Sequence, residues 1–321
     1  MSLLTHVLSV MLATNSTIAA VSNEVQAATG LSLPLVDPND PAERALHQIM
    51  LDDDAAMESV AQSIQLNQTS ATNGAAATPE QVKQGLRARL DIVRKEYEEF
   101  LKKFPDSARG HLAYGTFLND IGEEYEGSVE YEKSRQLDPK NPAVWNDLAN
   151  YYGENSPVTN AFAYYAKAIE LDPAESVYYQ NLATTVYLFR HDATNFYGIT
   201  EAEVFDKSLA LYRQAMALDP GNLPLATDYA QSFYEIHPLR TNDALVAWTN
   251  ALALTHTETE REGVYVHLAR LKIGIGRYDE ARAHLAAITN ADLLGIRHRL
   301  ERNLADKEHP GTNAPPADAG D

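Results

Sequence analysis

The sequence contains no cysteine, which excludes disulfide bonds, thiolate metal sites and a cysteine nucleophile together. Positive charge is also scarce, because 26 Lys and Arg residues face 45 Asp and Glu residues and leave a formal net charge of -19. Such an acidic surface repels phosphate backbones and anionic lipid headgroups, so we expect no nucleic-acid partner. No segment approaches the ~20 apolar residues of a membrane-spanning helix, so we expect no membrane insertion.

Motifs for catalysis and metal binding are missing as well. None of the 10 histidines forms a His-x-x-x-His pair, and neither a Gly-x-Ser-x-Gly elbow nor a Gly-x-x-x-x-Gly-Lys phosphate loop is present. His191 and Asp192 provide fewer ligands than a stable metal site needs. The run Asp52 to Asp54 lacks the spacing and the glycine of a calcium loop, so we interpret it as a solvated helix face. We therefore expect no catalytic residue, metal, cofactor or small-molecule substrate.

The N-terminal segment leaves the cellular compartment open. An apolar run from Leu3 to Leu12 precedes Ala27 and Ala28, whose small side chains would suit a signal peptidase. However, no Lys or Arg occurs before Arg44, whereas a signal peptide normally begins with basic residues. Two interpretations therefore stand, an exported periplasmic protein and a cytoplasmic protein with an ordinary N-terminus.

A short phrase, Leu-Asp-Pro, ends at Pro139, Pro173 and Pro220, and a further helix-ending proline, Pro105, precedes them. Pro105, Pro139 and Pro173 stand 34 residues apart, and Pro220 follows after 47, which is 34 plus an insertion of 13. Proline ends a helix because it lacks an N–H and its ring clashes with the preceding turn. Asn141, in front of Pro142, is typical of a helix N-cap followed by proline in the first turn. The fixed period therefore predicts stacked repeat units in which each phrase ends one helix and starts the next.

The residues inside each period identify the repeat. Between Asn141 and Pro173, small and apolar residues stand at Trp145, Leu148, Ala149, Tyr152, Ala161, Tyr165 and Ala168. This pattern resembles the tetratricopeptide repeat, with Ala149 in place of the usual glycine. The resemblance implies an all-α fold, a right-handed superhelical α-solenoid of stacked antiparallel helix pairs.

The same pattern predicts a division of the chain. Residues 105–289 form five such repeats, and the third carries the 13-residue insertion near 190–202. We expect an aromatic loop around Phe196 and Tyr197 there, followed by a helix that begins near Glu201, since Thr200 and Glu203 match a capping box. Residues 41–104 are expected to form N-terminal capping helices and a half repeat, and residues 290–307 a C-terminal capping helix. Residues 1–40 are expected to be disordered or a signal segment, and residues 308–321 a disordered tail.

The first helix of each unit is expected to line a concave groove. The positions that we expect to face inward carry amides, hydroxyls and one guanidinium, namely Thr116, Asn146, Asn150, Gln180, Thr184, Thr227, Gln231 and Arg270. Side-chain amides both donate and accept, so a regular row could hold the backbone of an extended peptide. The alternative is that these residues are simply wet polar positions on an exposed helix face.

Our leading prediction is a non-enzymatic scaffold that binds a protein or an extended peptide segment in this groove. Some members of the family grip a terminal carboxylate with Lys and Arg, but Arg109 and Arg270 lie too many units apart here to act as one clamp. Residues 105–257 hold 21 acidic and 9 basic residues, which favours a basic or neutral segment. The alternatives are a periplasmic or envelope assembly or transport adaptor, and a glycan-acting enzyme or its regulatory subunit, which would need paired carboxylates such as Asp120 and Glu154.

Overall fold

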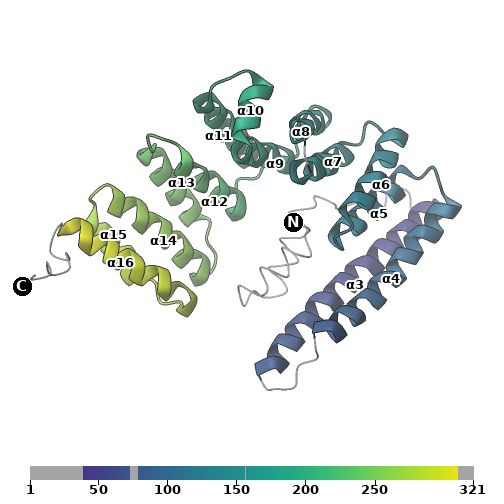
Figure 1. The fold of residues 1–321 in the computed structure, drawn as a ribbon, viewed down its shortest axis with the longest axis horizontal. Coiled ribbons are helices and arrows are strands. Elements are labelled where there is room, and N and C mark those ends of the chain that lie inside the picture. Colours follow the sequence, from purple (N-terminus) through teal and green to yellow (C-terminus); the bar gives the residue numbers. More distant parts are fainter. Residues whose placement is uncertain (1–38, 73–78, 156, 310–321) are drawn as a thin grey trace, which may run out of the picture. The chain divides into compact units, whose positions relative to one another are not determined.

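The computed structural model describes residues 39–72, 79–155 and 157–309. In these ranges all regular secondary structure is helical, and successive helices pack as antiparallel pairs, which confirms the predicted all-α class (Figure 1). The chain divides into two compact units, unit 1 (Met1–Thr185) and unit 2 (Val186–Asp321). Apart from Asn39 and Asp40, the predicted signal or disordered segment lies outside the described residues, as does the predicted tail from residue 310. The division into capping segments and five repeats stays a prediction.

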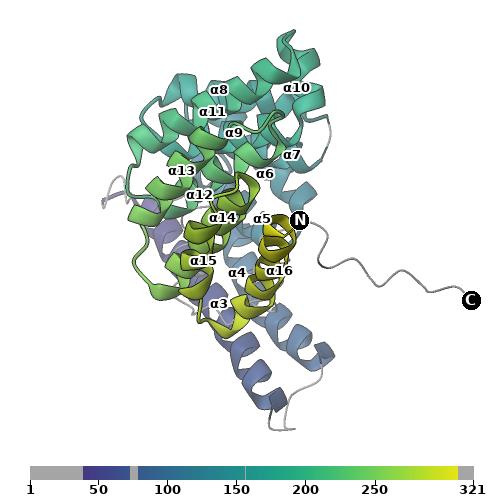
Figure 2. The same ribbon diagram turned by 90° about the vertical axis from the view of Figure 1, so that its left-hand side faces the viewer.

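Unit 1 opens with a long helical hairpin and continues with shorter helix pairs. Its helices are α3 (Pro41–Thr72), α4 (Pro79–Lys103), α5 (Ala108–Asp120), α6 (Glu124–Leu137), α7 (Pro142–Glu154), α8 (Thr159–Leu171) and α9 (Ser176–Leu188), the last of which crosses the unit boundary. Figure 2 shows α3 and α4 running side by side. Leu46 and Val60 of α3, Tyr97 of α4 and Phe117 of α5 are buried together, so the hairpin shares its core with the first repeat.

The acidic run Asp52 to Asp54 is not the purely solvated face that we predicted. The Tyr97 hydroxyl, buried in the core, donates to Asp53 Oδ2 at 3.1 Å. Burial raises the pKa of Asp53 to about 7, the hydrogen bond from Tyr97 opposes this rise, and the neighbouring charge of Asp54 adds to it. The sequence around Asp53 does not show this contact, because its partner lies on another helix, 44 residues along the chain.

The 34-residue period corresponds to a repeated hydrogen bond. In three successive units one ring of the first helix donates to the carbonyl oxygen of the proline six residues before it. The pairs are His111 Nε2 with Pro105 O at 2.9 Å, Trp145 Nε1 with Pro139 O at 2.9 Å, and Tyr179 OH with Pro173 O at 3.2 Å. His, Trp and Tyr can each fill this sequence position, because each ring carries a hydrogen-bond donor. The bond links the start of the first helix to the proline that ends the preceding helix.

The stop and start signals act as predicted at the junction before α7. Asp138 Oδ1 accepts from the Lys140 N–H at 3.1 Å, which closes the turn around Pro139. Asn141 is the N-cap, since its side chain accepts from the Ala143 N–H at 3.0 Å, and Pro142 is the first helical residue. The interpretation of the phrase as a stop joined to a start is confirmed here.

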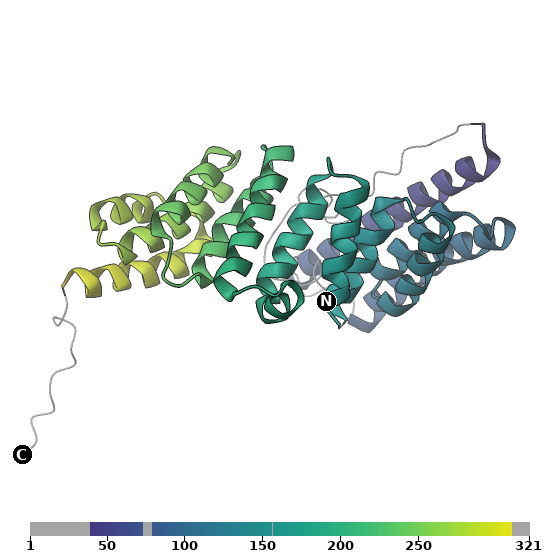
Figure 3. The same cartoon turned by 90° about the horizontal axis from the view of Figure 1, so that it is seen from above.

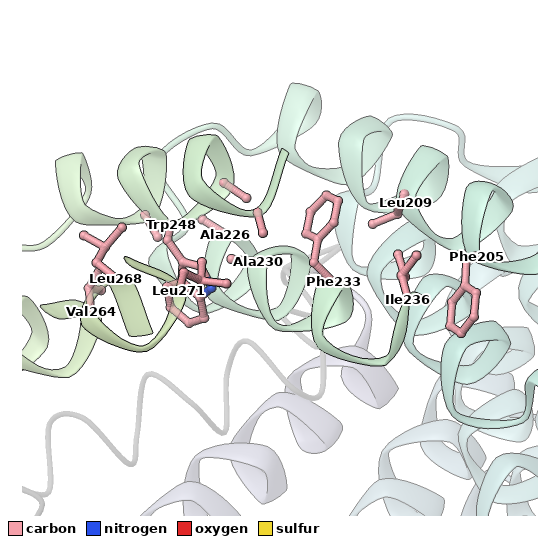
Figure 4. Close-up of a cluster of buried hydrophobic side chains, with 13 residues drawn as sticks. Phe205, Leu209, Ala226, Ala230, Phe233, Ile236, Trp248, Val264, Leu268 and Leu271 are labelled. Carbon is pink, nitrogen blue, oxygen red and sulfur yellow. The ribbon is translucent and has the colours of Figure 1, made fainter. Parts of the chain in front are cut away.

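Unit 2 is itself built from packed helices (Figure 3). Its elements are α10 (Arg190–Tyr197), α11 (Glu201–Leu218), α12 (Leu223–Gln231), the 3-10 helix η1 (Ser232–Glu235), α13 (Thr241–Ala253), α14 (Glu258–Gly274), α15 (Tyr278–Ala286), the 3-10 helix η2 (Ala291–Leu293) and α16 (Leu294–Glu308). Trp248 of α13 is buried in its larger core with residues of α11, α12 and α14 (Figure 4). Leu300 and Leu304 of α16 are buried in a second core with residues of α14 and α15.

The insertion is helical, which corrects the predicted aromatic loop. Phe196 and Tyr197 lie in the last turn of α10, where their rings meet edge to face and Phe196 is 43% exposed. The helix forms because Ala193 is buried, and it ends at Gly198, whose φ of 65° suits glycine at a helix C-terminus. The predicted capping box of Thr200 is confirmed, and α11 begins at Glu201.

A buried carboxylate holds the turn after α15 against α14. Glu262 of α14 accepts hydrogen bonds from the Thr289 N–H at 3.0 Å, the Thr289 hydroxyl at 2.7 Å and the Asn290 N–H at 2.7 Å. Burial alone would raise the pKa of Glu262, but these hydrogen bonds lower it below its ordinary value. The ionised side chain therefore serves as the acceptor for a turn 27 residues away.

Candidate functional site

The predicted groove residues fall into two sets. Thr116 on α5, Asn146 and Asn150 on α7, and Gln180 and Thr184 on α9 belong to unit 1. The other set, Thr227 and Gln231 on α12 and Arg270 on α14, belongs to unit 2. Thr116, Asn150 and Thr184 stand 34 residues apart and are all partly exposed. Unit 1 therefore presents one polar side chain at the same position of three successive first helices.

Asn146 is not an exposed groove residue, which corrects our prediction for this position. It is 2% exposed, and its carboxamide bonds to two neighbouring side chains. Asn146 Nδ2 donates to Asp147 Oδ1 at 3.2 Å, and Asn146 Oδ1 accepts from Asn181 Nδ2 at 2.9 Å. Since Asn181 belongs to α9, the amide of Asn146 joins two consecutive first helices instead of facing a ligand.

The carboxamide of Asn150 is oriented by two neighbouring side chains. Its Oδ1 accepts from the Tyr165 hydroxyl at 2.6 Å and, at 3.5 Å, from Asn181 Nδ2. Two donors on one side fix which end of the carboxamide is the oxygen. Asn150 is partly exposed, and among the described residues its Nδ2 has no hydrogen-bond partner. The structure therefore holds an oriented N–H donor on the wall of unit 1.

The predicted hydroxyls also bond within their own helices. Thr116 Oγ1 donates to Leu112 O at 3.2 Å, Thr184 Oγ1 donates to Gln180 O at 3.0 Å, and Thr227 Oγ1 donates to Pro224 O at 2.7 Å. A hydroxyl that donates to the backbone retains lone pairs that can accept a hydrogen bond. Thr116 Oγ1 also accepts from the Tyr131 hydroxyl at 3.4 Å. The three side chains therefore carry acceptor oxygens on the first helices.

The predicted residues of unit 2 are more exposed than those of unit 1. Gln231 and Arg270 are exposed, and the Arg270 guanidinium lies over the Tyr234 ring, 5.6 Å from its centroid. The Tyr234 hydroxyl and His267 Nδ1 share a hydrogen bond of 2.9 Å. Burial, with a smaller contribution from the positive charge of Arg270, lowers the pKa of His267 to about 4, so its ring is neutral at pH 7.

Two carboxyl groups that our prediction of the groove omitted lie on first helices of unit 1. Asp147 on α7 is 6% exposed, and burial raises its pKa to about 7 although the hydrogen bond from Asn146 opposes the rise. Asp120, the last residue of α5, is partly exposed. Burial and the nearby charges of Asp53 and Asp147 raise the pKa of Asp120 well above its ordinary value.

Comparison with known proteins agrees with the repeat. A family model described as Tetratricopeptide repeat matches residues 142–175, the unit that carries Asn150 and Asp147. Residues 142–175 therefore form a tetratricopeptide repeat. No curated protein sequence matches the chain.

Solved structures show the same tetratricopeptide fold. The chain is similar to PilW, described as a widely conserved type IV pilus biogenesis factor, with a TM-score of 0.51 and 12% identity over 68% of this chain and 94% of PilW. It is also similar to PilF of Pseudomonas aeruginosa, with a TM-score of 0.50 and 14% identity over 76% of this chain and 99% of PilF. At these identities the likeness concerns the fold alone. The tetratricopeptide fold is a scaffold for protein interactions, which implies a protein or peptide partner.

The residues that we missed stand one position beyond those that we chose. In two repeat units we took Asn146, which follows Trp145, and Gln180, which follows Tyr179, as inward-facing. The next residues, Asp147 and Asn181, also lie 34 apart and enter the network between the helices. Since one residue turns a helix by about 100°, the two neighbours lie on different sides of it. The recurrence of a polar residue at Asp147 and Asn181, one repeat apart, was the sequence signal for hydrogen bonds between the helices.

The structure adds little to the enzymatic alternative. The charges that raise the pKa of Asp120 come from Asp53, Asp147 and Asp54, and Glu154 is not among them. Within the described residues no group of three or more His, Cys, Asp or Glu could hold a metal ion. In the same part of the chain, no helix is long and apolar enough to cross a membrane.

Proposed function

We propose that unit 1 binds an extended segment of a protein partner along α5, α7 and α9, and that the protein acts as a non-enzymatic scaffold. The observation that carries this proposal is the oriented Asn150 carboxamide, whose oxygen is held by Tyr165 and Asn181 and whose Nδ2 has no partner among the described residues. Such a donor suits a backbone carbonyl of the partner, a group present in every peptide.

The regular spacing of the wall supports an extended ligand. Thr116 and Thr184 occupy the position of Asn150 in the preceding and following units. An extended peptide repeats its carbonyl and N–H groups along its length, so side chains that recur at a regular interval can bond successive groups. Because the hydroxyls accept and the Asn150 amide donates, the wall meets both kinds of backbone group.

A selection with a random library of short peptides displayed on phage tests this proposal. The purified full chain should enrich a set of peptides, and the best of them should bind in a fluorescence anisotropy titration. The substitution Asn150→Asp keeps an oxygen for Tyr165 and Asn181 but replaces the Nδ2 donor. Loss of one hydrogen bond, worth about 1 kcal/mol, should weaken binding about fivefold.

A matched control separates the donor from the added charge. Asn303 on α16 of unit 2 is exposed, so Asn303→Asp adds the same charge away from the wall. Its affinity for the peptide should equal that of the wild type. If no peptide is enriched, or if Asn150→Asp binds as tightly as Asn303→Asp, this wall of unit 1 is not the binding surface.

A further inference from the structure

Two buried carboxyl oxygens in unit 1 lack the hydrogen bonds that buried polar atoms normally make. Asp147 Oδ1 accepts from Asn146, but within the described residues Asp147 Oδ2 has no hydrogen-bond partner. The same holds for Asp120 Oδ1 on the neighbouring first helix. Roughly nine in ten buried polar groups in folded proteins are hydrogen-bonded, so two exceptions on adjacent helices call for an explanation.

The groups that face these carboxyls from the surrounding helices are acidic or neutral. The charge of Asp147 acts on Asp120 and on the hydroxyls of Tyr131 on α6, Tyr165 on α8 and Tyr178 on α9. Asp120 also lies in the field of Asp53 and Asp54 of α3. None of the main causes that shift the pKa values of Asp120 and Asp147 is a positive charge.

The wall contains one Lys or Arg, Arg109 of α5, and this residue pairs with Glu43 of α3 at 3.4 Å. Neither α7 nor α9 contains Lys or Arg, as their sequences show. A buried carboxylate without a cationic partner is costly, so such groups tend to take up a proton, and the pKa values of Asp120 and Asp147 are raised accordingly. A cation brought by a ligand would offset this cost and would bond the two free oxygens.

We propose that Asp120 and Asp147 form an anchor for one cationic side chain, Lys or Arg, of the extended segment that lies on this wall. This inference rests on the proposed function, since it specifies which segment the wall accepts. Asp120 is partly exposed and is the member that the cation would reach from solvent, while Asp147 is buried. Asn150, one turn along α7 from Asp147, holds the backbone of the same segment.

An organic cation suits the pair better than a metal ion does. Calcium takes 6–8 oxygen ligands, and magnesium needs six in octahedral geometry. The described residues contain no group of three or more candidate metal ligands. An ammonium or guanidinium group needs only acceptors for its N–H groups, and two carboxyl oxygens on neighbouring helices provide them.

The peptide selection described above also tests this anchor. The peptides enriched on the wild-type chain should align with Lys or Arg at one fixed position. Replacing that residue with Gln in the best peptide should weaken binding about tenfold, as expected for a hydrogen-bonded charge pair. The same replacement should change the affinity of the Asp120→Asn variant less than twofold, because the anchor is already lost.

Matched variants make the outcome decisive. Asp106→Asn removes an exposed carboxylate of unit 1 outside α5, α7 and α9, so it should retain the full tenfold effect. Asp147→Asn should behave like Asp120→Asn, and circular dichroism melting checks that both variants are folded. If Asp147→Asn does not fold, the Asp120→Asn measurement decides.

The failures of the two proposals differ. If no peptide is enriched, the binding wall and its anchor fall together. If peptides are enriched and depend on Asn150 but show no fixed Lys or Arg, the scaffold stands and the anchor is wrong. A cationic position whose replacement costs the same in Asp120→Asn as in the wild type also overturns the anchor.

Discussion

Replacing Gly127 with alanine should destabilise unit 1, because the contact between α5 and α6 leaves no room for a side chain. Gly127 is buried in α6 and faces Gly115 of α5. A Cβ atom at Gly127 would lie 2.8 Å from the Gly115 carbonyl oxygen and 3.2 Å from the Asn119 backbone nitrogen. Both are backbone atoms that cannot rotate away, so the two helices would have to separate.

Two opposing effects set the magnitude. Alanine is favoured over glycine in a helix interior by about 1 kcal/mol, which would stabilise α6. Overpacking a tight contact typically costs about 1–3 kcal/mol. Because the clash involves backbone on the facing helix, we expect the cost to lie toward the upper end of that range. The net loss should then be about 1–2 kcal/mol.

The control is Gly85 of α4, where a Cβ would meet no atom within 4 Å. Gly85→Ala should therefore stabilise unit 1 by about 0.5–1 kcal/mol through helix propensity alone. The sequence has two tryptophans, and in a Trp248→Phe background the fluorescence of Trp145 reports on unit 1. A local probe is needed because stacked repeats need not unfold in one step.

Urea unfolding of the three proteins in this background, followed by Trp145 fluorescence, gives the comparison. The midpoint should fall for Gly127→Ala and rise for Gly85→Ala. If Gly127→Ala is as stable as Gly85→Ala, the close approach of α5 and α6 does not limit the residue at this position.

The remaining predictions concern pH. The pKa of Asp147 in the folded chain is about 7, above its ordinary value of 3.8. Between these two values the folded chain holds a proton that the unfolded chain releases. The stability of unit 1 should therefore fall as pH rises from about 4 to about 7. The stability of the Asp147→Asn variant relative to the wild type, measured by Trp145 fluorescence, should therefore increase between pH 5 and pH 8. A stability difference that does not change with pH would contradict this. Glu262 should give the opposite pH dependence, because its pKa is lowered on folding. Its stabilisation of unit 2 is present above the ordinary Glu pKa of 4.5 and is lost as pH falls through the lower folded pKa. Glu262→Gln should therefore be less stable than the wild type at pH 7, as measured by Trp248 fluorescence in a Trp145→Phe background. This stability difference should shrink as the pH is lowered. A difference that does not depend on pH would show that the carboxylate charge is unimportant.

Features that depend on neighbouring residues were predictable. The N-cap of Asn141 and the capping box of Thr200 involve atoms no more than three residues apart, so a short stretch of sequence contains the whole interaction. The helix α10 escaped prediction because it is only 8 residues long and has a single fully buried residue, Ala193. So short a helix is stabilised by its packing more than by its own sequence.

The candidate site was predictable only in part. Asn150 was assigned to the groove from its place in the repeat, which stays a prediction, and the structure added that Tyr165 and Asn181 orient its amide. Asn146 was assigned to the exposed wall because a single sequence does not show which side of a polar helix position the next helix covers. Its burial depends on Asn181, 35 residues away.

The amino-acid sequence by itself determined the repeat, its helix boundaries and its acidic character, because these follow from local capping, helix-ending prolines and residue counts. Only the tertiary structure decided which polar groups are buried and hydrogen-bonded inside unit 1 and which are exposed where a partner could bind. The cost of a buried amide or carboxyl depends on hydrogen-bond partners from other helices. Asp147 and Asn150 lie three residues apart on α7, yet packing buries the first and leaves the second partly exposed.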